Sequence, residues 1–177
     1  MVLTAEGAVL LLIDLQERLM PVIADHEVVV ARAVRLAEAA TLLDVPVRAT
    51  EQNPAGLGPT VPQLAGYAQA VMSKTTFSAA GDPGFPALLP AGSGEIVVAG
   101  VEAHVCVLQT VLGLLGSGRQ VIVAADAVGS RDPADRAAAL DRARQHGAEI
   151  VTSEMVLFEW LHDSRHPKFR EVQKLLK

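Results

Sequence analysis

The stretch EIVVAGVEAHVCVLQTVLGLL, residues 95–115, decides the fold that we expect for this chain. Residues 96–99 form a short β-branched apolar run that ends at a glycine, whereas Val105, Leu108 and Leu112 recur at helical spacing. This pattern predicts a strand, a tight turn and a helix. In a parallel sheet such a turn lies at the carboxyl edge of the strands, where open α/β folds bind their ligands.

The single cysteine of the chain, Cys106, falls in the first turn of this predicted helix. There the unpaired N–H groups and the positive end of the helix dipole favour a thiolate over a thiol, which would make Cys106 a nucleophile. The alternative is that Cys106 is a buried packing residue, as lone cysteines often are. Position alone leaves both interpretations open.

Length and composition predict one compact domain over residues 1–177. The chain has 177 residues, 50% of them hydrophobic, which is enough to bury a sizeable core. Its formal net charge is -5 and it has no basic block, so we expect a small-molecule substrate and no nucleic-acid partner. The apolar run at residues 8–13 is too short to span a bilayer. With a single cysteine, this predicts a cytoplasmic protein without a membrane partner.

Apolar runs of strand length alternate with helical patterns along the chain. Strands are predicted at residues 8–13, 45–50, 67–72, 96–99, 119–124 and 149–151. Helices are predicted at residues 27–43, from Asp132 and Pro133 to about His146, after a cap at Thr152 or Ser153, and at 169–176. Residues 51–62, EQNPAGLGPTVP, are expected to form an irregular loop. The order predicts an α/β protein with three layers and a doubly wound parallel sheet.

Two charged residues stand at the carboxyl ends of predicted strands. Asp14 directly follows residues 8–13, and its carboxylate is either a general base in the crevice or a loop cap. Lys74 follows residues 67–72 as the first lysine of the chain, and it either serves a site or snorkels into solvent. Cys106 lies just beyond a third strand. In a parallel sheet these ends face one crevice.

Two other patterns do not indicate cofactor sites. The sequence GSG at residues 92–94 precedes its strand instead of following it and lacks a third glycine, so it is not a dinucleotide-binding turn. His162 and His166 have the spacing of a metal pair, but Pro167 ends the helix there. We therefore expect no cofactor and no metal.

Three stretches, LLLIDLQERL, VMSKTTFSA and above all VVAGVEAHVCVLQTVLGLL, resemble the isochorismatase-like cysteine hydrolases. With EQNPAGLGPTVPQL, they make the chain most similar to the hydrolases called isochorismatase domain-containing proteins. The resemblance extends over residues 9–159. It implies the Rossmann-like isochorismatase fold, with six parallel strands in the order 3-2-1-4-5-6, and a homo-oligomer.

The same resemblance implies a catalytic triad of Asp14, Lys74 and Cys106. It places a non-proline cis peptide bond between Val101 and Glu102. The use of that bond would be to aim the Glu102 N–H beside the Cys106 N–H, where the two form an oxyanion hole.

The substrate pocket is expected beside this triad. We expect Gln52, Phe77 and Val101 to line it. Phe77 and Phe85 belong to the loop-rich residues 75–90, where each either lines a pocket or packs beneath it.

These residue types predict acyl transfer. A thiol with a pKa of about 8.5 is only a few per cent thiolate at neutral pH, and Lys74 at about 4 Å would favour its anion by up to about 4 kcal/mol. Asp14 takes the Cys106 proton, the sulfur attacks a carbonyl carbon, Asp14 protonates the leaving amine, and water hydrolyses the thioester. The expected activity is metal-independent hydrolysis of a small amide or related carbonyl compound.

Two departures from relatives bear on the substrate. Metal-dependent nicotinamidases of the superfamily carry an Asp-x-His element where this chain has EQN at residues 51–53, and neutral amides are weak ligands for transition metals. The enzyme that gives the superfamily its name cleaves a vinyl ether and lacks the cysteine. The alternative functions are a non-catalytic scaffold or binding protein that retains the pocket, and a nucleotide- or flavin-binding domain, for which the glycine-rich turn after the first strand is missing.

Overall fold

The computed structural model describes residues 2–176. Within them the strands are β1 (Val9–Ile13), β2 (Val47–Gln52), β3 (Ala70–Lys74), β4 (Glu95–Val101), β5 (Gln120–Gly129) and β6 (Glu149–Val151). They form one parallel sheet of six strands in the order β3-β2-β1-β4-β5-β6, which confirms the predicted fold class and strand order.

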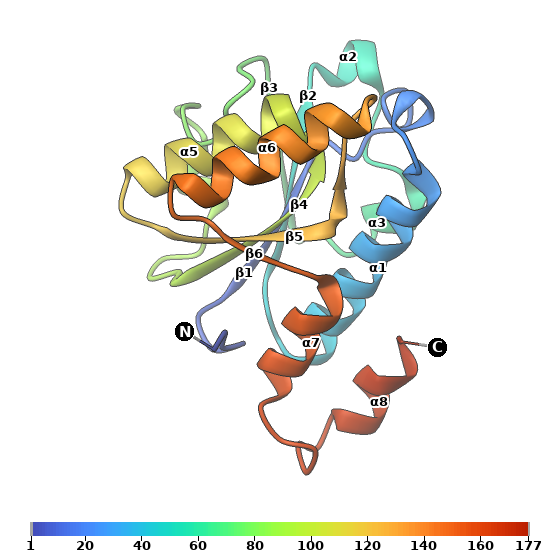
Figure 1. The fold of residues 1–177 in the computed structure, drawn as a ribbon, viewed down its shortest axis with the longest axis vertical. Helices are drawn as coiled ribbons and strands as arrows, with labels where there is room; N and C mark the ends of the chain where they lie inside the picture. The colour runs from blue at the N-terminus through green and yellow to red at the C-terminus, as the bar shows by residue number, and fades with distance from the viewer. Residues whose placement is uncertain (1, 177) are drawn as a thin grey trace.

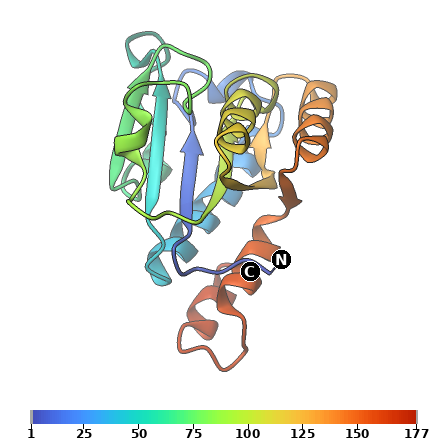
Figure 2. The ribbon, with the colours of Figure 1, turned by 90° about the vertical axis from the view of Figure 1, so that its left-hand side faces the viewer.

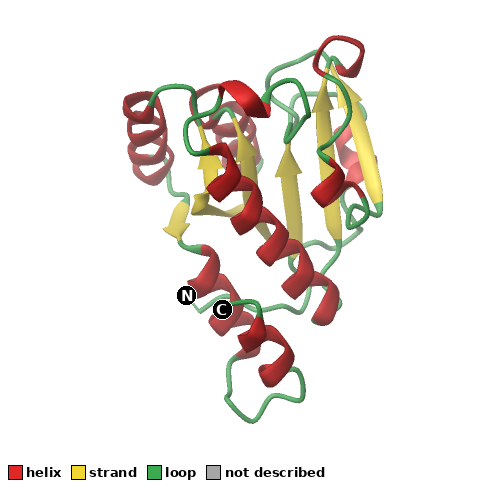
Figure 3. Cartoon of the chain, turned by 90° about the vertical axis from the view of Figure 1, so that its right-hand side faces the viewer, coloured by secondary structure: helices red, strands yellow, loops and turns green. Residues whose placement is uncertain are grey.

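Helices cover both faces of this sheet (Figure 1). One face carries α1 (His26–Leu42), α3 (Pro62–Ala65), α7 (Ser153–Leu161) and α8 (Phe169–Lys174). The other carries α4 (Phe85–Leu88), α5 (Leu108–Gly116) and α6 (Pro133–Gln145). Figure 3 shows α1 lying across the strands. Two short helices, η1 (Met20–Val22) and α2 (Pro54–Leu57), belong to the connections after β1 and β2.

The central strand β1 is buried along its whole length because both of its faces are covered. Leu10 and Leu12 pack into the core beneath α1 and α7. Val9, Leu11 and Ile13 pack into the second core, beneath α5 and α6. Alternation of side chains along one apolar run therefore contributes to two separate hydrophobic cores.

The strands share a direction that places their carboxyl ends together. Figure 2 shows β1 and β2 pointing toward the end of the molecule that carries α2, whereas both ends of the chain lie toward the opposite end. In this parallel sheet the residues that follow β1, β2 and β4 meet at the α2 end.

No helix within residues 2–176 is long and apolar enough to cross a membrane.

Several strands extend further than the sequence predicts. β2 continues through Gln52 and β3 through Lys74, although the prediction ended these strands at residues 50 and 72. Polar residues take part in the sheet here because their side chains bond to one another, which a count of apolar residues does not reveal. Residues 51–62 are likewise not wholly irregular, since α2 forms within them and α3 begins at Pro62.

Gly100 allows β1 and β4 to approach closely. It pairs with Ile13 in the sheet register and has a φ of 140°, a conformation that side chains rarely permit. A Cβ atom at this position would overlap with the backbone of Ile13. The sheet register against β5 also shifts between Val98 and Gly100.

Candidate active site

Asp14 and Lys74 form a buried ion pair at the carboxyl edge of the sheet. The Lys74 Nζ donates to Asp14 Oδ2 at 2.7 Å, and both side chains have an exposed fraction of 0%. Asp14 follows β1 in a left-handed backbone conformation with a φ of 52°, and Lys74 is the last residue of β3. The alternative in which Lys74 snorkels into solvent is therefore wrong.

Lys74 is held by further acceptors besides the carboxylate. Its ammonium donates to Gln52 Oε1 at 2.8 Å and to the carbonyl oxygens of Thr76 and Phe77, each at 3.3 Å. An ammonium has three N–H donors, so these acceptors satisfy it fully. The Gln52 amide group in turn donates to the carbonyl oxygen of Thr75 at 2.8 Å. Both polar ends of Gln52 are thus used in positioning Lys74, rather than left free for a substrate.

Thr50 and Gln16 complete the polar cluster, and the sequence did not indicate either of them. The Thr50 hydroxyl donates to Asp14 Oδ1 at 2.7 Å. The side chain of Gln16 accepts from the Gln52 N–H at 2.7 Å and donates to the carbonyl oxygens of Gln52 and Gly58. Thr50 and Gln16 are both wholly buried. A threonine in a strand and a glutamine in a loop are common, so the only available signal was their closeness to Asp14 and Gln52.

Cys106 lies in a π-helical turn, η2 (Ala103–Val107), rather than in the first turn of an α-helix. The Val107 N–H donates to the Glu102 carbonyl oxygen at 3.2 Å, five residues back, and α5 begins only at Leu108. The cysteine is 6% exposed and packs in the core on the α5 side of the sheet. Cys106 is therefore buried among apolar residues, as the alternative of a packing residue predicts. Its neighbours also include the charged side chains of Asp14 and Lys74.

The resting state of Cys106 is a neutral thiol. The pKa of the Cys106 thiol is raised to about 12, chiefly by burial and next by the negative charge of Asp14, against the lowering effect of Lys74. The expectation that the thiolate is favoured is therefore wrong, because loss of hydration outweighs the attraction of the ammonium. The structure nevertheless brings Asp14, Lys74 and Cys106 together, since the two charged side chains are the groups that act on the thiol.

The turn that carries Cys106 is tied to the loop after β5. The peptide bond between Val101 and Glu102 is cis, at the place where the family resemblance puts it. The Glu102 carboxylate accepts from Arg131 Nε at 2.7 Å. The His104 Nδ1 lies 3.0 Å from Ser130 Oγ. Glu102, which follows the cis bond, and His104, which lies within the π turn, are thereby fixed to residues 130–131.

The residues expected to line a pocket have different surroundings. Val101 is wholly buried in the core on the α1 side, whereas Cys106 packs on the α5 side, so the Val101 side chain does not face the thiol. Phe85 packs in the core beneath α5. Phe77 is 54% exposed, and its carbonyl oxygen accepts from Lys74. Of the expected pocket residues, Gln52 and Phe77 therefore adjoin the ion pair through Lys74.

The loop that holds a metal in some relatives of the superfamily has other bonds here. Glu51 Oε1 accepts from the Thr60 N–H at 2.7 Å and from its hydroxyl at 2.8 Å. Gln52 is bonded to Lys74, and Asn53 precedes α2 in a left-handed conformation without a capping bond from its side chain. Across residues 2–176 no group of three or more His, Cys, Asp or Glu side chains is arranged to hold a metal ion.

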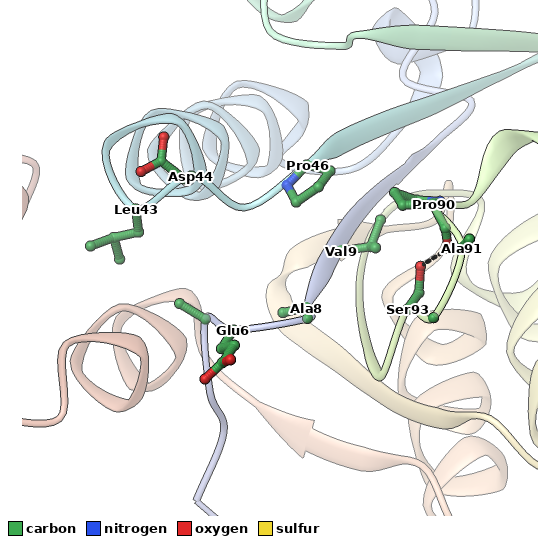
Figure 4. A pocket seen from close by; sticks show the side chains of 12 residues that line it. Glu6, Ala8, Val9, Leu43, Asp44, Pro46, Pro90, Ala91 and Ser93 are labelled. Carbon is green, nitrogen blue, oxygen red and sulfur yellow. Dashed lines mark hydrogen bonds between the residues drawn. The ribbon is translucent and has the colours of Figure 1, made fainter.

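A cavity of about 430 Å³ lies at the opposite edge of the sheet. Figure 4 shows it between three chain segments, residues 5–9, residues 43–46 and residues 90–93. The first segment leads into the amino end of β1, whereas Asp14 follows its carboxyl end. The cavity therefore shares no residue with the polar cluster. Size alone does not mark the candidate active site of this protein.

Comparison with known proteins shows the family to which the chain belongs. A model of the isochorismatase domain matches residues 8–155. "Isochorismatase domain-containing protein 2A" of Mus musculus is 43% identical over 177 residues, which cover 97% of this chain and 84% of that protein.

Two solved structures extend the comparison to the whole fold. A MAR1 ribonuclease from Caenorhabditis elegans has a TM-score of 0.93 and 39% identity, covering 99% of this chain and 92% of that one. The YcaC gene product of Escherichia coli, an octameric hydrolase of unknown specificity, has a TM-score of 0.87 and 26% identity, covering 97% and 94%. The chain therefore belongs to the family of isochorismatase-like hydrolases.

Proposed function

We propose that the protein is a metal-independent cysteine hydrolase that acts on a small amide or related carbonyl compound through a thioester on Cys106. The observation that carries this proposal is the wholly buried pair of Asp14 and Lys74 beside the only thiol of the chain. Burying two charges costs several kcal/mol per ion, and an apolar pair of similar volume is often at least as stable. A catalytic use accounts for this arrangement better than a packing role does.

The first step couples proton transfer to attack. Because the pKa of the Cys106 thiol is raised to about 12, a free thiolate is scarce at neutral pH. Asp14 takes the proton as the sulfur forms its bond to the carbonyl carbon, and the π electrons of the carbonyl move to its oxygen. The positive charge of Lys74, which is bonded to Asp14, opposes the repulsion between the carboxylate and the sulfur.

The tetrahedral intermediate needs hydrogen-bond donors that point at its negatively charged oxygen. We assign this role to the N–H groups of Glu102 and Cys106. The Glu102 N–H donates to no other backbone group within residues 2–176, so it remains available. The side chains of Glu102 and His104 are bonded to the loop after β5, which holds this backbone in place.

The second half of the reaction releases both products. The oxyanion collapses, the bond from carbon to nitrogen breaks, and Asp14 gives its proton to the departing amine. Water then attacks the thioester with Asp14 as the base. The sulfur leaves, regains a proton and restores the resting thiol. The sum is amide and water to carboxylic acid and amine, with no cofactor.

A small substrate fits this site better than a polymer does. The C. elegans relative is described as a ribonuclease, but here Asp14, Lys74 and Cys106 are each at most 6% exposed, and the chain carries a net charge of -5. An RNA backbone needs an accessible, basic surface. We propose a small-molecule substrate, no nucleic-acid or membrane partner, and a homo-oligomer in the cytoplasm, in keeping with the octamer of the E. coli relative.

The test is a panel of small primary amides assayed for ammonia release. The intact protein should release ammonia from at least one member and should accumulate an acyl group on Cys106 that mass spectrometry detects after rapid acid quenching. Cys106→Ala should lose both signals, whereas Ser93→Ala, at the opposite edge, should keep them. Unchanged turnover by Cys106→Ala, or cleavage of RNA with no amide turnover, would contradict the proposal.

Metal independence is tested separately. The purified protein should contain no stoichiometric zinc, iron or manganese by elemental analysis, and chelators should leave its activity unchanged. One tightly bound metal per chain, with activity lost on its removal, would place the protein with the metal-dependent members instead.

A further inference from the structure

The carboxylate of Asp14 accepts one short hydrogen bond on each oxygen. Lys74 Nζ donates to Oδ2 and the Thr50 hydroxyl donates to Oδ1, both at 2.7 Å. Asp14 and Thr50 are wholly buried, and so is the side chain of Lys74. Charge balance explains the bond from the ammonium. It does not explain the second bond, which comes from a neutral hydroxyl.

Thr50 is built to hold Asp14 by both its backbone and its side chain. It pairs with Ile13 in the register of β1 and β2, and its carbonyl oxygen accepts from the Asp14 N–H at 3.1 Å. The ionised carboxylate offers only acceptors, so the Thr50 hydroxyl must be the donor. Hydrogen bonds to an ionised acceptor are about twice as strong as neutral ones. The bond therefore stabilises the carboxylate more than the protonated acid and weakens Asp14 as a base.

We propose that Thr50 is a positioning residue that sets how readily Asp14 takes the proton of Cys106, and with it the lowest pH at which the thiol reacts. The inference rests on the proposed function, in which Asp14 is the base. The groups that face Asp14 from neighbouring elements are Lys74 on β3, Thr50 on β2 and the Cys106 thiol on η2. Thr50 is the only one of these three that carries neither a charge nor a titratable proton.

The pH dependence of Cys106 alkylation isolates this effect and requires no substrate. While Asp14 and Cys106 share one proton, the reactive fraction is the one with the proton on Asp14 and a thiolate on Cys106. A stronger base at Asp14 enlarges that fraction. It also moves the acid limb of the rate profile to higher pH by the same factor. At still lower pH, where both groups are protonated, the variant and the parent protein react at the same rate.

The experiment follows iodoacetamide modification of Cys106 by mass spectrometry from pH 4 to pH 10 in the intact protein. Thr50→Val removes the hydroxyl and keeps the branched shape. It should move the acid limb up by about one to two pH units and raise the plateau rate about 10- to 100-fold, with coincident rates at the lowest pH. Thr50→Ser, which keeps the hydroxyl, should follow the parent profile.

The outcomes separate the two proposals. An acid limb that is present in the parent protein, absent from Asp14→Asn and unmoved by Thr50→Val would overturn the inference about Thr50 alone. A parent profile identical to that of Asp14→Asn would overturn the role of Asp14 as base. A uniform loss of rate in Thr50→Val without a shift would make Thr50 merely structural. Circular dichroism checks folding, and Thr50→Ala replaces Thr50→Val if the latter is unfolded.

Discussion

The two edges of the sheet differ in where their space and their chemistry lie. The amino edge has a cavity of about 430 Å³ that is lined mainly by small residues, with Glu6 and Asp44 as the charged residues of its lining (Figure 4). The carboxyl edge has a closely packed polar cluster around the buried pair of Asp14 and Lys74. Reactive groups gain from exclusion of water, because their interactions strengthen in a low dielectric. The function that we propose for this protein therefore rests on buried, fully bonded charge and not on empty volume.

The largest expected difference between the edges is in activity. Cys106→Ser replaces the thiol by a poorer nucleophile in the same place, and turnover of the best amide should fall by at least about 10³-fold. Ser93→Ala, in the lining of the amino-edge cavity, should change turnover by less than about twofold. Steady-state kinetics of both variants measure the contrast. Equal losses would mean that the two edges do not differ in function.

Stability should show the next largest difference. Lys74→Met leaves the Asp14 carboxylate buried without its cation and should lower the free energy of unfolding by about 3 to 5 kcal/mol. Glu6→Gln, at the rim of the cavity, should change it by less than about 0.5 kcal/mol. Urea titrations give both values. The double variant Asp14→Asn with Lys74→Met should recover part of the loss, and a double variant less stable than Lys74→Met would contradict this account of the pair.

A smaller effect concerns the stability of the carboxyl edge at alkaline pH. The unfolded thiol ionises near pH 9.0 and the folded thiol at about pH 12, since burial raises the pKa of Cys106. Its contribution to stability is complete below pH 9.0 and is lost as the pH rises toward 12, because only the unfolded chain releases the proton in that range. Relative to Cys106→Ala, the free energy of unfolding should decline by about 2 to 3 kcal/mol between pH 8 and pH 11. Ser93→Ala should decline as the parent does.

The smallest expected effect tests the attachment of the cysteine turn. Arg131→Gln removes the ion pair with Glu102, which lies at the surface on the arginine side, so stability should change by at most about 1 kcal/mol. If the pair orients the Glu102 N–H, kcat should fall several-fold while KM stays the same. A change in KM alone would indicate that Arg131 contacts the substrate instead.

The fold was predictable because its signals are local. The continuous apolar run that became β1 and the helical spacing after Cys106 each need only a few neighbouring residues to be interpreted. The carboxyl ends of β2 and β3 were less predictable. Gln52 and Lys74 join the sheet because they bond to each other across neighbouring strands, and this pairing depends on contacts between distant parts of the sequence.

The residues that meet at the carboxyl edge of the sheet were partly predictable, but their electrostatics were not. Asp14 and Lys74 are polar residues at the ends of apolar runs, so they stood out. Thr50 did not, because threonine is an ordinary strand residue. The predicted direction of the pKa shift at Cys106 was wrong, because the shift depends on how two opposing effects compare. The attraction of Lys74 follows from one contact, whereas the cost of burial depends on every group packed around the sulfur.

The close approach of Gly100 to Ile13 fixes the main chain of β4 against the main chain of β1 beside the candidate site. Asp14 lies one residue beyond this contact and Glu102 two residues beyond it. The distance from Asp14 to the turn that carries Cys106 is therefore set by a direct contact between two backbone segments, with no side chain between them. Loops farther out can change in length and composition, and so in the substrate that they admit, without altering that distance. A methyl group at residue 100 would disturb that distance, because it would overlap with the backbone of Ile13.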